Sequence, residues 1–487
     1  MIPRVKLSVS EDTTRYYTTS VDFVPVIIMK TMSGEIGTRQ VIRSESEFIA
    51  KFGKGTADTP ASYAIQTYLR TYSFIYVTRV ASDSAAYGSA KLTLKDAENH
   101  NIDLLSFKTS YKTASFNGTE LKLVYDEETK KLFVTTVLNS STVTSVKETI
   151  DLSSEETTAI TISKALDTIV TSINAMSLGF KAENLFVNKT AEDAKPVIAA
   201  ENICTIAEGD SGLTGIKDSD VIAAINEYAA SDIQIDVLTT PEFNSLDVIN
   251  AGVKAAEDFG FMYITSPSAS EYSTAITDVV SYPKSESLAV YWPNVKYANF
   301  DTVIPASVAV LTSYARNDNI NKWLSPAGVN RGLLPLVNEL DVPGNLTEEE
   351  MSDLYDNVIP INVIKYVPNT GYAVWGQKTT ATGDVYMDRI NVARLVKYVY
   401  REVYNISLDF LFEPINENTF TNWGLRVGSL LEEIKTNQGI IDYKYKMDDE
   451  NNTEATIAEN YLIGQVSVRP TEVAEFIDID FVLTSEV

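Results

Sequence analysis

The sequence has one cysteine and one histidine among its 487 residues, and this scarcity excludes several classes of chemistry. Zinc hydrolysis, Ser–His–Asp catalysis and Cys–His catalysis all need these residue types with partners at a defined spacing. His100 lies in the polar segment KDAENHNIDL and is interpreted as a surface residue. Cys204 has no histidine near it in sequence and is interpreted as a small buried residue. A single cysteine allows no intramolecular disulfide, as expected for a chain that folds in a reducing cytoplasm.

Long apolar runs and an excess of positive charge are also missing. No run of roughly 18 apolar residues occurs, so no transmembrane helix is expected, and residues 1–30 show no signal-peptide pattern. The net charge of −26 disfavours nucleic-acid binding, because a phosphate backbone would be repelled. We therefore expect no direct contact with nucleic acid and no membrane insertion. The length of 487 residues predicts two to four domains of ordinary globular composition.

Motifs that bind nucleotides or metals are absent from the pattern as well. No G-x-G-x-x-G follows an expected strand. The segment GYAVWGQKTT is nearest to a phosphate-binding loop, but it carries an extra residue before Lys378 and its centre predicts a strand. The run Asp448–Asn452 lacks the alternation of a calcium loop and predicts a solvated turn. We expect no catalytic residue, no cofactor and no metal, while carboxylate or lysine chemistry stays formally open.

The distribution of apolar and polar residues predicts a mixed α/β chain that is divided into segments. Residues 21–84 alternate apolar runs with helical segments and predict the first part of an α/β core. Residues 85–206 alternate apolar and polar positions and predict a β-rich insertion domain. Residues 207–360 return to strands that alternate with helices, which predicts parallel βαβ units.

The C-terminal part differs again. Residues 361–474 contain two amphipathic helices, near 386–407 and 419–439, followed by a β-hairpin. Residues 1–20 and 475–487 alternate apolar and polar positions without an obvious partner strand, and predict extended arms. The expected fold class is an α/β core built from discontinuous segments, with βαβ units, a C-terminal α+β section, a β-rich insertion domain and extended terminal arms.

Several motifs follow one another in an order seen in one known family. They are VIIMKTMSGEIGT, SEFIAKFG, VIPASVAVLTSYARNDNINKWLSPAG, PINVIKYVPNTGYAVWGQKTT, DRINVARL, FEPINENTFTNW and RPTEVAEFIDIDF. In this order the chain resembles the contractile-tail sheath proteins of myophages and related contractile injection systems. It departs from the family at Gly34–Gly37, where Gly–Pro is common, and at Lys378, where arginine is common. Residues 85–200 match nothing in the family.

The resemblance implies a structural protein. Such a subunit would polymerise as stacked hexameric rings around a tail tube and contract to drive the tube through the target cell envelope. Its partners would be further copies of itself, the tail tube protein, and baseplate and tail terminator proteins. It would be part of a phage virion, in the tail, after assembly in the host cytoplasm, or part of a bacteriocin-like or injection-system particle.

Two groups of residues are expected to make contacts between subunits. Terminal strands exchanged with neighbours would use Pro3, Val5, Leu7 and Val9 at one end, and Phe476, Asp478 in the segment FIDIDF, Phe481 and Leu483 at the other. Basic residues expected to contact the tube or another subunit are Arg389, Arg394, Lys397, Arg401 and Arg331. For Arg331, simple solvation is equally open, and Trp323 is expected to pack beneath the nearby Gly328 and Gly332.

Two other functions stay open at this point. One is an α/β enzyme with an acidic Asp/Glu active site and a β-rich accessory domain. It would need convergent carboxylates in a pocket at the strand C-termini, and the sequence selects no such pair. The other is a sugar-binding tail or surface protein, which would depend only on the Thr-rich insertion.

Overall fold

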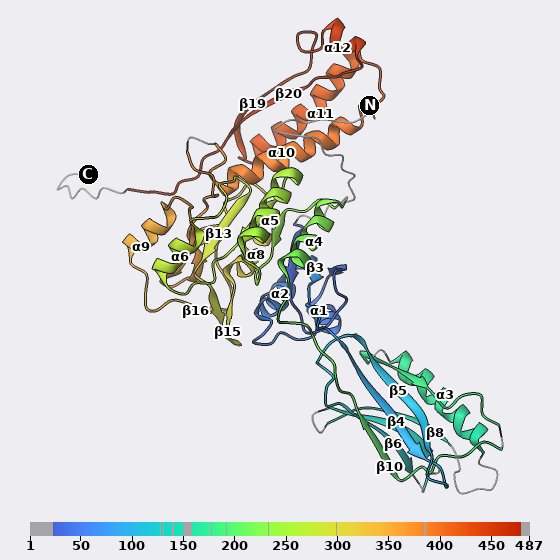
Figure 1. Cartoon of the computed structure of the whole chain (residues 1–487). Helices are drawn as coiled ribbons and strands as arrows, with labels where there is room; N and C mark the ends of the chain where they lie inside the picture. The colour runs from blue at the N-terminus through green and yellow to red at the C-terminus, as the bar shows by residue number, and fades with distance from the viewer. Residues whose placement is uncertain are drawn as a thin grey trace. The chain divides into compact units, whose positions relative to one another are not determined.

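The computed structural model describes residues 23–126, 128–129, 131–138, 141–149, 158–176, 178–190, 192–231, 233–298, 300–383 and 386–478. The chain divides into two compact units, and Figure 1 colours the ribbon by residue number from blue to red. The first unit comprises Met1–Ile27 and Ile225–Val487, and the second comprises Ile28–Ala224. This division differs from the six segments expected from the sequence, whose limits remain a prediction.

A central sheet organises the first unit, with the strand order β18-β17-β13-β12-β11-β1. Its strands are β1 (Pro25–Met29), β11 (Val237–Thr239), β12 (Met262–Thr265), β13 (Leu288–Trp292), β17 (Asn362–Val367) and β18 (Gly371–Val374). All neighbouring pairs are parallel except β17 and β18, which are antiparallel. Every residue of β1, β11, β12 and β13 is buried, as is typical of a parallel sheet covered on both faces.

Helices alternate with these strands along the chain. They are α4 (Asp218–Ala229), α5 (Leu246–Phe259), α6 (Tyr272–Val279), α7 (Ala306–Ala309), α8 (Leu311–Asp318) and α9 (Glu348–Tyr355). The helix α5 shows why they form where they do: the Ser245 hydroxyl accepts a hydrogen bond from the Val248 amide, and Gly260 ends the helix in the left-handed region. A small antiparallel sheet adds β14 (Val295–Tyr297), β15 (Phe300–Ile304) and β16 (Val337–Leu340).

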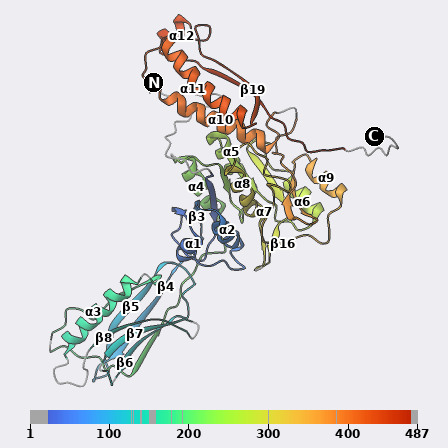
Figure 2. The ribbon, with the colours of Figure 1, turned by 180° about the vertical axis from the view of Figure 1, so that it is seen from behind.

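The end of the first unit is a helical hairpin covered by a β-hairpin. Its elements are α10 (Ile390–Leu408), α11 (Glu417–Thr436), β19 (Ile440–Lys446), α12 (Glu454–Ala458) and β20 (Gln465–Pro470). Figures 1 and 2 show α10 and α11 side by side, and both helices contribute to one apolar cluster. The strand β19 packs on α11, where Gly424 and Gly428 leave room for the ring of Tyr445.

The second unit begins with two strands and two helices and continues into a β-rich body. The first elements are β2 (Arg39–Ile42), α1 (Glu45–Phe52), α2 (Pro60–Thr71) and β3 (Ile75–Arg79). The body contains β4 (Tyr87–Lys95), β5 (Asn101–Lys112), β6 (Glu120–Asp126), β7 (Lys131–Leu138), β8 (Ser141–Thr149), α3 (Ala159–Ala175), β9 (Phe180–Asn184) and β10 (Glu201–Thr205).

The β-rich body has its own hydrophobic core. Its strands form two antiparallel sheets, in the orders β4-β5-β9 and β10-β6-β7-β8. The helix α3 contributes Ile162, Leu166, Ile169 and Ile173 to this core. These elements lie inside the span 85–206 that the sequence predicts to be a β-rich insertion. The expected mixed α/β class is confirmed, with several sheets in one chain.

Candidate functional site

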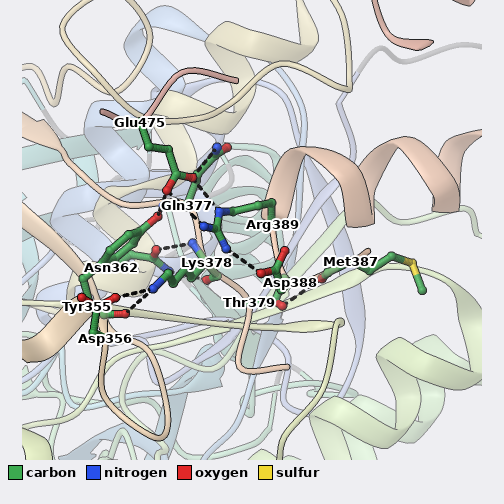
Figure 3. Close-up of polar contacts among 10 residues, drawn as sticks. All are labelled: Tyr355, Asp356, Asn362, Gln377, Lys378, Thr379, Met387, Asp388, Arg389 and Glu475. Atoms are coloured by element: carbon green, nitrogen blue, oxygen red, sulfur yellow. Dashed lines mark hydrogen bonds and ion pairs between the residues drawn. The ribbon is translucent and has the colours of Figure 1, made fainter. Parts of the chain in front are cut away.

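The segment that follows β20 is held at Glu475 by three side chains. Arg389 donates from Nε to Oε1 of Glu475 at 2.6 Å and from Nη2 to Oε2 at 3.2 Å. Gln377 donates from Nε2 to Oε1 at 3.0 Å, and the hydroxyl of Tyr355 donates to Oε2 at 3.2 Å. Figure 3 shows the three donors converging on the carboxylate. We call these four residues the Glu475 clamp.

Backbone pairing brings two of the clamp residues together. The segment after β18 runs beside the residues that precede α10, where the Ile390 amide donates to the Gln377 carbonyl and the Thr379 amide to the Asp388 carbonyl. Arg389 occupies the last non-helical position before α10, and its Nη1 is 2.7 Å from Oδ2 of Asp388. This pairing fixes the guanidinium next to the Gln377 amide.

Asn362, at the start of β17, holds the same segment from the other side. Its Nδ2 donates to the Lys378 carbonyl at 2.8 Å, and its Oδ1 accepts from the Lys378 amide at 2.7 Å. The side chain of Lys378 donates to the Tyr355 carbonyl and to Asp356, and its Nζ lies 4.2 Å from the centre of the Tyr355 ring. Lys378 therefore braces a clamp residue, which gives this lysine a role unrelated to phosphate.

The electrostatics favour a charged Arg389 and a protonated Tyr355. Burial works against the charge of Arg389, but the hydrogen bond to Glu475 offsets it and raises the pKa of the guanidinium. Burial, together with the charge of Glu475, raises the pKa of Tyr355 well above its ordinary value. Both groups thus remain hydrogen-bond donors to the carboxylate at neutral pH. The pair is only partly shielded, since the side chains of Arg389 and Glu475 are 28% and 17% exposed.

Directly after the clamp, large apolar side chains point into solvent. Phe476 is 84% exposed and Ile477 is 75% exposed, and Asp478, the last described residue, is also exposed. Residues 471–478 form no strand within the single chain. The other expected exchange positions, Pro3, Val5, Leu7, Val9, Phe481 and Leu483, lie outside the described residues. Strand exchange between subunits therefore stays a prediction.

Two of the expected contact residues are buried inside the first unit. Arg394 and Arg401, both on α10, are 5% and 7% exposed. Arg394 Nη2 lies 2.6 Å from Oδ2 of Asp318, and Arg401 Nη1 lies 2.8 Å from Oδ1 of Asp236. Lys322 completes the group, with Nζ 2.7 Å from Oδ2 of Asp236. We call these five residues the α10 charge network.

The two carboxylates of this network respond to burial in opposite directions. Asp236 is held by two cations, Lys322 and Arg401, which outweigh the effect of burial and lower its pKa. Asp318 has Arg394 close by, with Lys322 farther away at 4.0 Å, and burial, together with the charge of Asp236, raises its pKa to about 6. Asp236 also accepts a hydrogen bond from the Val24 amide at 2.9 Å, so it joins the start of β1 to α10.

The remaining contact residues also have partners within the chain. Lys397 donates to the Ser287 hydroxyl at 2.7 Å, and the Arg331 Nε donates to the Ser325 carbonyl at 3.2 Å within its own loop. Whether any of these basic residues contacts a tube or another subunit remains a prediction. The expectation that Trp323 packs beneath Gly328 and Gly332 is wrong. Its ring packs on Tyr398, and its Nε1 donates to the Asn437 carbonyl.

The residues suited to nucleophilic or metal chemistry are placed as follows. Cys204 is 9% exposed, and burial raises the pKa of its thiol to about 12. Asp96, Glu98 and His100 could bring ligand atoms within 4.8 Å of one another. The Asp96 carboxylate already accepts hydrogen bonds from the His100 amide and faces its ring, which closes the turn between β4 and β5, and we assign no metal to it. Among the described residues, no helix is long and apolar enough to span a membrane.

Comparisons with known proteins find no matching family model. In sequence, 191 residues are 29% identical to the tail sheath protein of Vibrio phage KVP40 and 28% identical to that of Enterobacteria phage T4. The aligned part is 39% of this chain and spans 28% of the length of each of these relatives.

Solved structures match over nearly the whole chain. The sheath complex of an extracellular contractile injection system, PVC, in its contracted state, aligns with a TM-score of 0.57 at 14% identity, covering 100% of this chain and 98% of that one. The sheath tail protein of Desulfitobacterium hafniense aligns with a TM-score of 0.61 at 10% identity, covering 90% and 94%. The chain has the fold of a contractile-tail sheath protein. The resemblance inferred from the sequence motifs is confirmed.

Proposed function

We propose that the chain is a structural sheath subunit that polymerises around a tail tube and contracts to drive the tube through a target envelope. The observation that carries this proposal is the sheath fold over nearly the whole chain, including a contracted-state sheath structure. Rings of six copies would stack along the tube, and the tube, baseplate and terminator proteins would be its partners. Its place would be a phage tail or an injection particle. Relatives that are named as sheath proteins favour this role over an acidic α/β enzyme.

The C-terminal arm is the element that would join neighbouring subunits. The Glu475 clamp fixes the point where the arm leaves the first unit, and Phe476 and Ile477 beyond it are exposed. Burying two such side chains against a neighbour would contribute on the order of 1.5–3 kcal/mol each. The arm is thus fixed at Glu475 and continues with exposed apolar residues. Such a segment is suited to pairing as an added strand with a sheet of another subunit.

The hairpin of β19 and β20 is the surface that would receive such an arm. It is a two-stranded sheet among the described residues, and most of its side chains are exposed or half-exposed. A two-stranded sheet is marginally stable alone and gains from further strands. Arms from neighbouring copies would therefore complete this sheet, and the lattice would stay linked while subunits shift during contraction.

Electron microscopy of the purified chain and two variants tests the proposal. The full chain is expected to form hollow striated cylinders, whereas a chain that ends at Glu475 is expected to stay folded and form none. Phe412→Ser is the matched control, since Phe412 is 85% exposed on the turn between α10 and α11 and lies far from the arm in sequence. Normal cylinders from the truncated chain would contradict the role of the arm. Failure of the full chain to polymerise with its tube protein present would contradict the sheath function.

A further inference from the structure

Two stretches of chain connect the β-rich body to the part of the second unit formed by β2, α1, α2 and β3, which we call the base. One stretch leads from β3 into β4, and the other returns from β10 to α4. The two stretches pair as an antiparallel ribbon. The Ala86 amide donates to the Asp210 carbonyl at 2.9 Å, and the Asp210 amide donates back to the Ala86 carbonyl at 3.1 Å. Ser89 and Ala207 exchange the same two bonds at 3.0 Å each. The connection is therefore a hydrogen-bonded ribbon, whereas a flexible linker carries few such contacts.

Further hydrogen bonds hold this ribbon and the β-rich body against the base. The Ser82 amide, just after β3, donates to the Gly212 carbonyl at 2.9 Å. The hydroxyl of Thr113, in the turn after β5, donates to the Met32 carbonyl of the base at 2.7 Å. The hydroxyl of Ser211, on the returning stretch, donates to the same carbonyl at 2.7 Å. One carbonyl of the base thus receives a bond from the β-rich body and another from its connection.

Arg79, the last residue of β3, lies where these segments meet and is completely buried. Its Nη1 donates to the Gly34 carbonyl of the base at 2.6 Å, and its Nη2 donates to the Ser211 carbonyl of the returning stretch at 2.7 Å. Its own carbonyl accepts a hydrogen bond from the Gly37 amide at 2.9 Å. One guanidinium therefore ties the chain that returns from the β-rich body to a turn of the base.

The charge of Arg79 shows that this contact needs an arginine. No carboxylate among the described residues pairs with the guanidinium, and its Nε is buried without a partner there. Burial lowers the pKa of Arg79 to about 10, so the side chain stays charged at neutral pH. Burying an unpaired cation is costly, and an apolar side chain would avoid that cost. What arginine alone supplies is a rigid fork of donors that reaches two separate segments at once.

We propose that Arg79 locks the β-rich body onto the base, so that the two move as one rigid piece. The β-rich body has a hydrophobic core of its own, yet it does not swing on its connection. Close packing at Gly212 supports this, since a Cβ added there would lie 2.7 Å from the Cβ of Ala85. Any movement of the base would carry the surface of the β-rich body with it. This proposal concerns the single chain and does not depend on the sheath function.

A distance measurement on the full chain tests the rigid connection. Spin labels are attached at Ala50→Cys on α1 and Lys164→Cys on α3, both of which are exposed positions. Cys204 is buried, so it need not be removed. The labelled chain is diluted with unlabelled chain, so that double electron–electron resonance reports distances within one molecule. A single narrow distance distribution is expected. A broad distribution would overturn the proposal, because the β-rich body would then swing relative to the base.

The variant Arg79→Met tests the role of the arginine in the same labelled chain. It removes both side-chain bonds and is expected to broaden the distance distribution. Hydrogen exchange of the Ser82 and Ala86 amides should become about tenfold faster, while amides of β6 and β7 keep their rates. Arg70→Met, which removes an exposed ion pair with Glu45 in the base, is the matched control and should change neither. An unchanged distribution and unchanged exchange in Arg79→Met would overturn the lock.

A pair of glycine variants decides the question if Arg79→Met does not fold. Gly212 and Gly215 both have a positive φ, of 63° and 72°, so alanine strains the backbone similarly at each. A Cβ at position 212 meets Ala85, whereas a Cβ at position 215 meets nothing within 4 Å. Only Gly212→Ala is expected to broaden the distance distribution. Equal distributions in the two variants would overturn the proposal, because the packed connection would then not determine the position of the β-rich body.

Discussion

Two ion-paired sites of the first unit use arginines of α10 and of the residue just before it, yet the sites differ in burial. Arg394 and Arg401 belong to the α10 charge network and are almost completely enclosed. Arg389, at the last non-helical position before α10, belongs to the Glu475 clamp, and its side chain is 28% exposed. A buried network is costly to disturb, because removing one partner leaves a charge without compensation. A half-exposed pair contributes little to stability and can be released, as a connection between moving subunits would require.

The largest effect in this comparison is expected from Asp236→Asn. The change leaves Lys322 and Arg401 without their carboxylate in the core of the first unit. We expect it to lower the free energy of unfolding by about 3–5 kcal/mol. Urea unfolding followed by tryptophan fluorescence measures the loss. Asp442→Asn, which breaks an exposed pair with Lys435, is the control and should cost far less than Asp236→Asn. Equal losses of unfolding free energy in the two variants would show that burial does not determine how much an ion pair contributes to stability.

A second prediction concerns pH and separates the two buried carboxylates. The pKa of Asp318 is raised to about 6 from an ordinary value of 3.8, so the folded chain binds this proton before the unfolded chain does. Its contribution to stability therefore increases as pH falls from 7 through about 6, and levels off below the unfolded value. Asp236 has a lowered pKa, and its contribution is lost only as pH falls below about 3.8.

The measurement compares the wild type with Asp318→Asn. Between pH 7 and pH 5, protonation of Asp318 should increase the free energy of unfolding of the wild type. The variant should lack this increase. Its cost relative to wild type at pH 7 should also be smaller than that of Asp236→Asn. A difference between wild type and variant that is independent of pH would contradict the raised pKa.

The same helix shows how far the sequence could lead. Its periodicity predicts an apolar stripe, and Ile390, Leu395, Val399 and Val403 are buried as expected. It also places Arg394 and Arg401 outside that stripe, where a surface position is the natural interpretation. Their acidic partners lie 76 and 165 residues away, so no local pattern indicates that these arginines are buried.

The sequence does not indicate the Glu475 clamp either, because its residues lie far apart along the chain. The strand in GYAV was predicted, and it forms β18, but Gln377 and Glu475 are 98 residues apart. The segments that contain Gln377 and Glu475 both resemble motifs of the sheath family. That resemblance does not indicate which side chains contact each other. By contrast, Cys204 is interpreted as a small buried residue because no histidine lies near it in sequence. In the structure Cys204 is buried, as expected.

The smallest effect on stability, and the one closest to function, is expected from Glu475→Gln. The clamp is partly exposed, so the change should alter the free energy of unfolding by less than about 1 kcal/mol. The arm would nevertheless lose the charge-assisted bonds that fix its exit point, since Arg389 and Tyr355 would face a neutral amide. We expect faster proteolysis between Glu475 and the C-terminus, and fewer cylinders in micrographs. Glu472→Gln, an exposed residue three positions earlier, is the matched control and should change neither. If Glu475→Gln caused a large loss of stability and left the cylinders unchanged, the clamp would act as part of the folded core, like the α10 charge network, and would have no role in contacts between subunits.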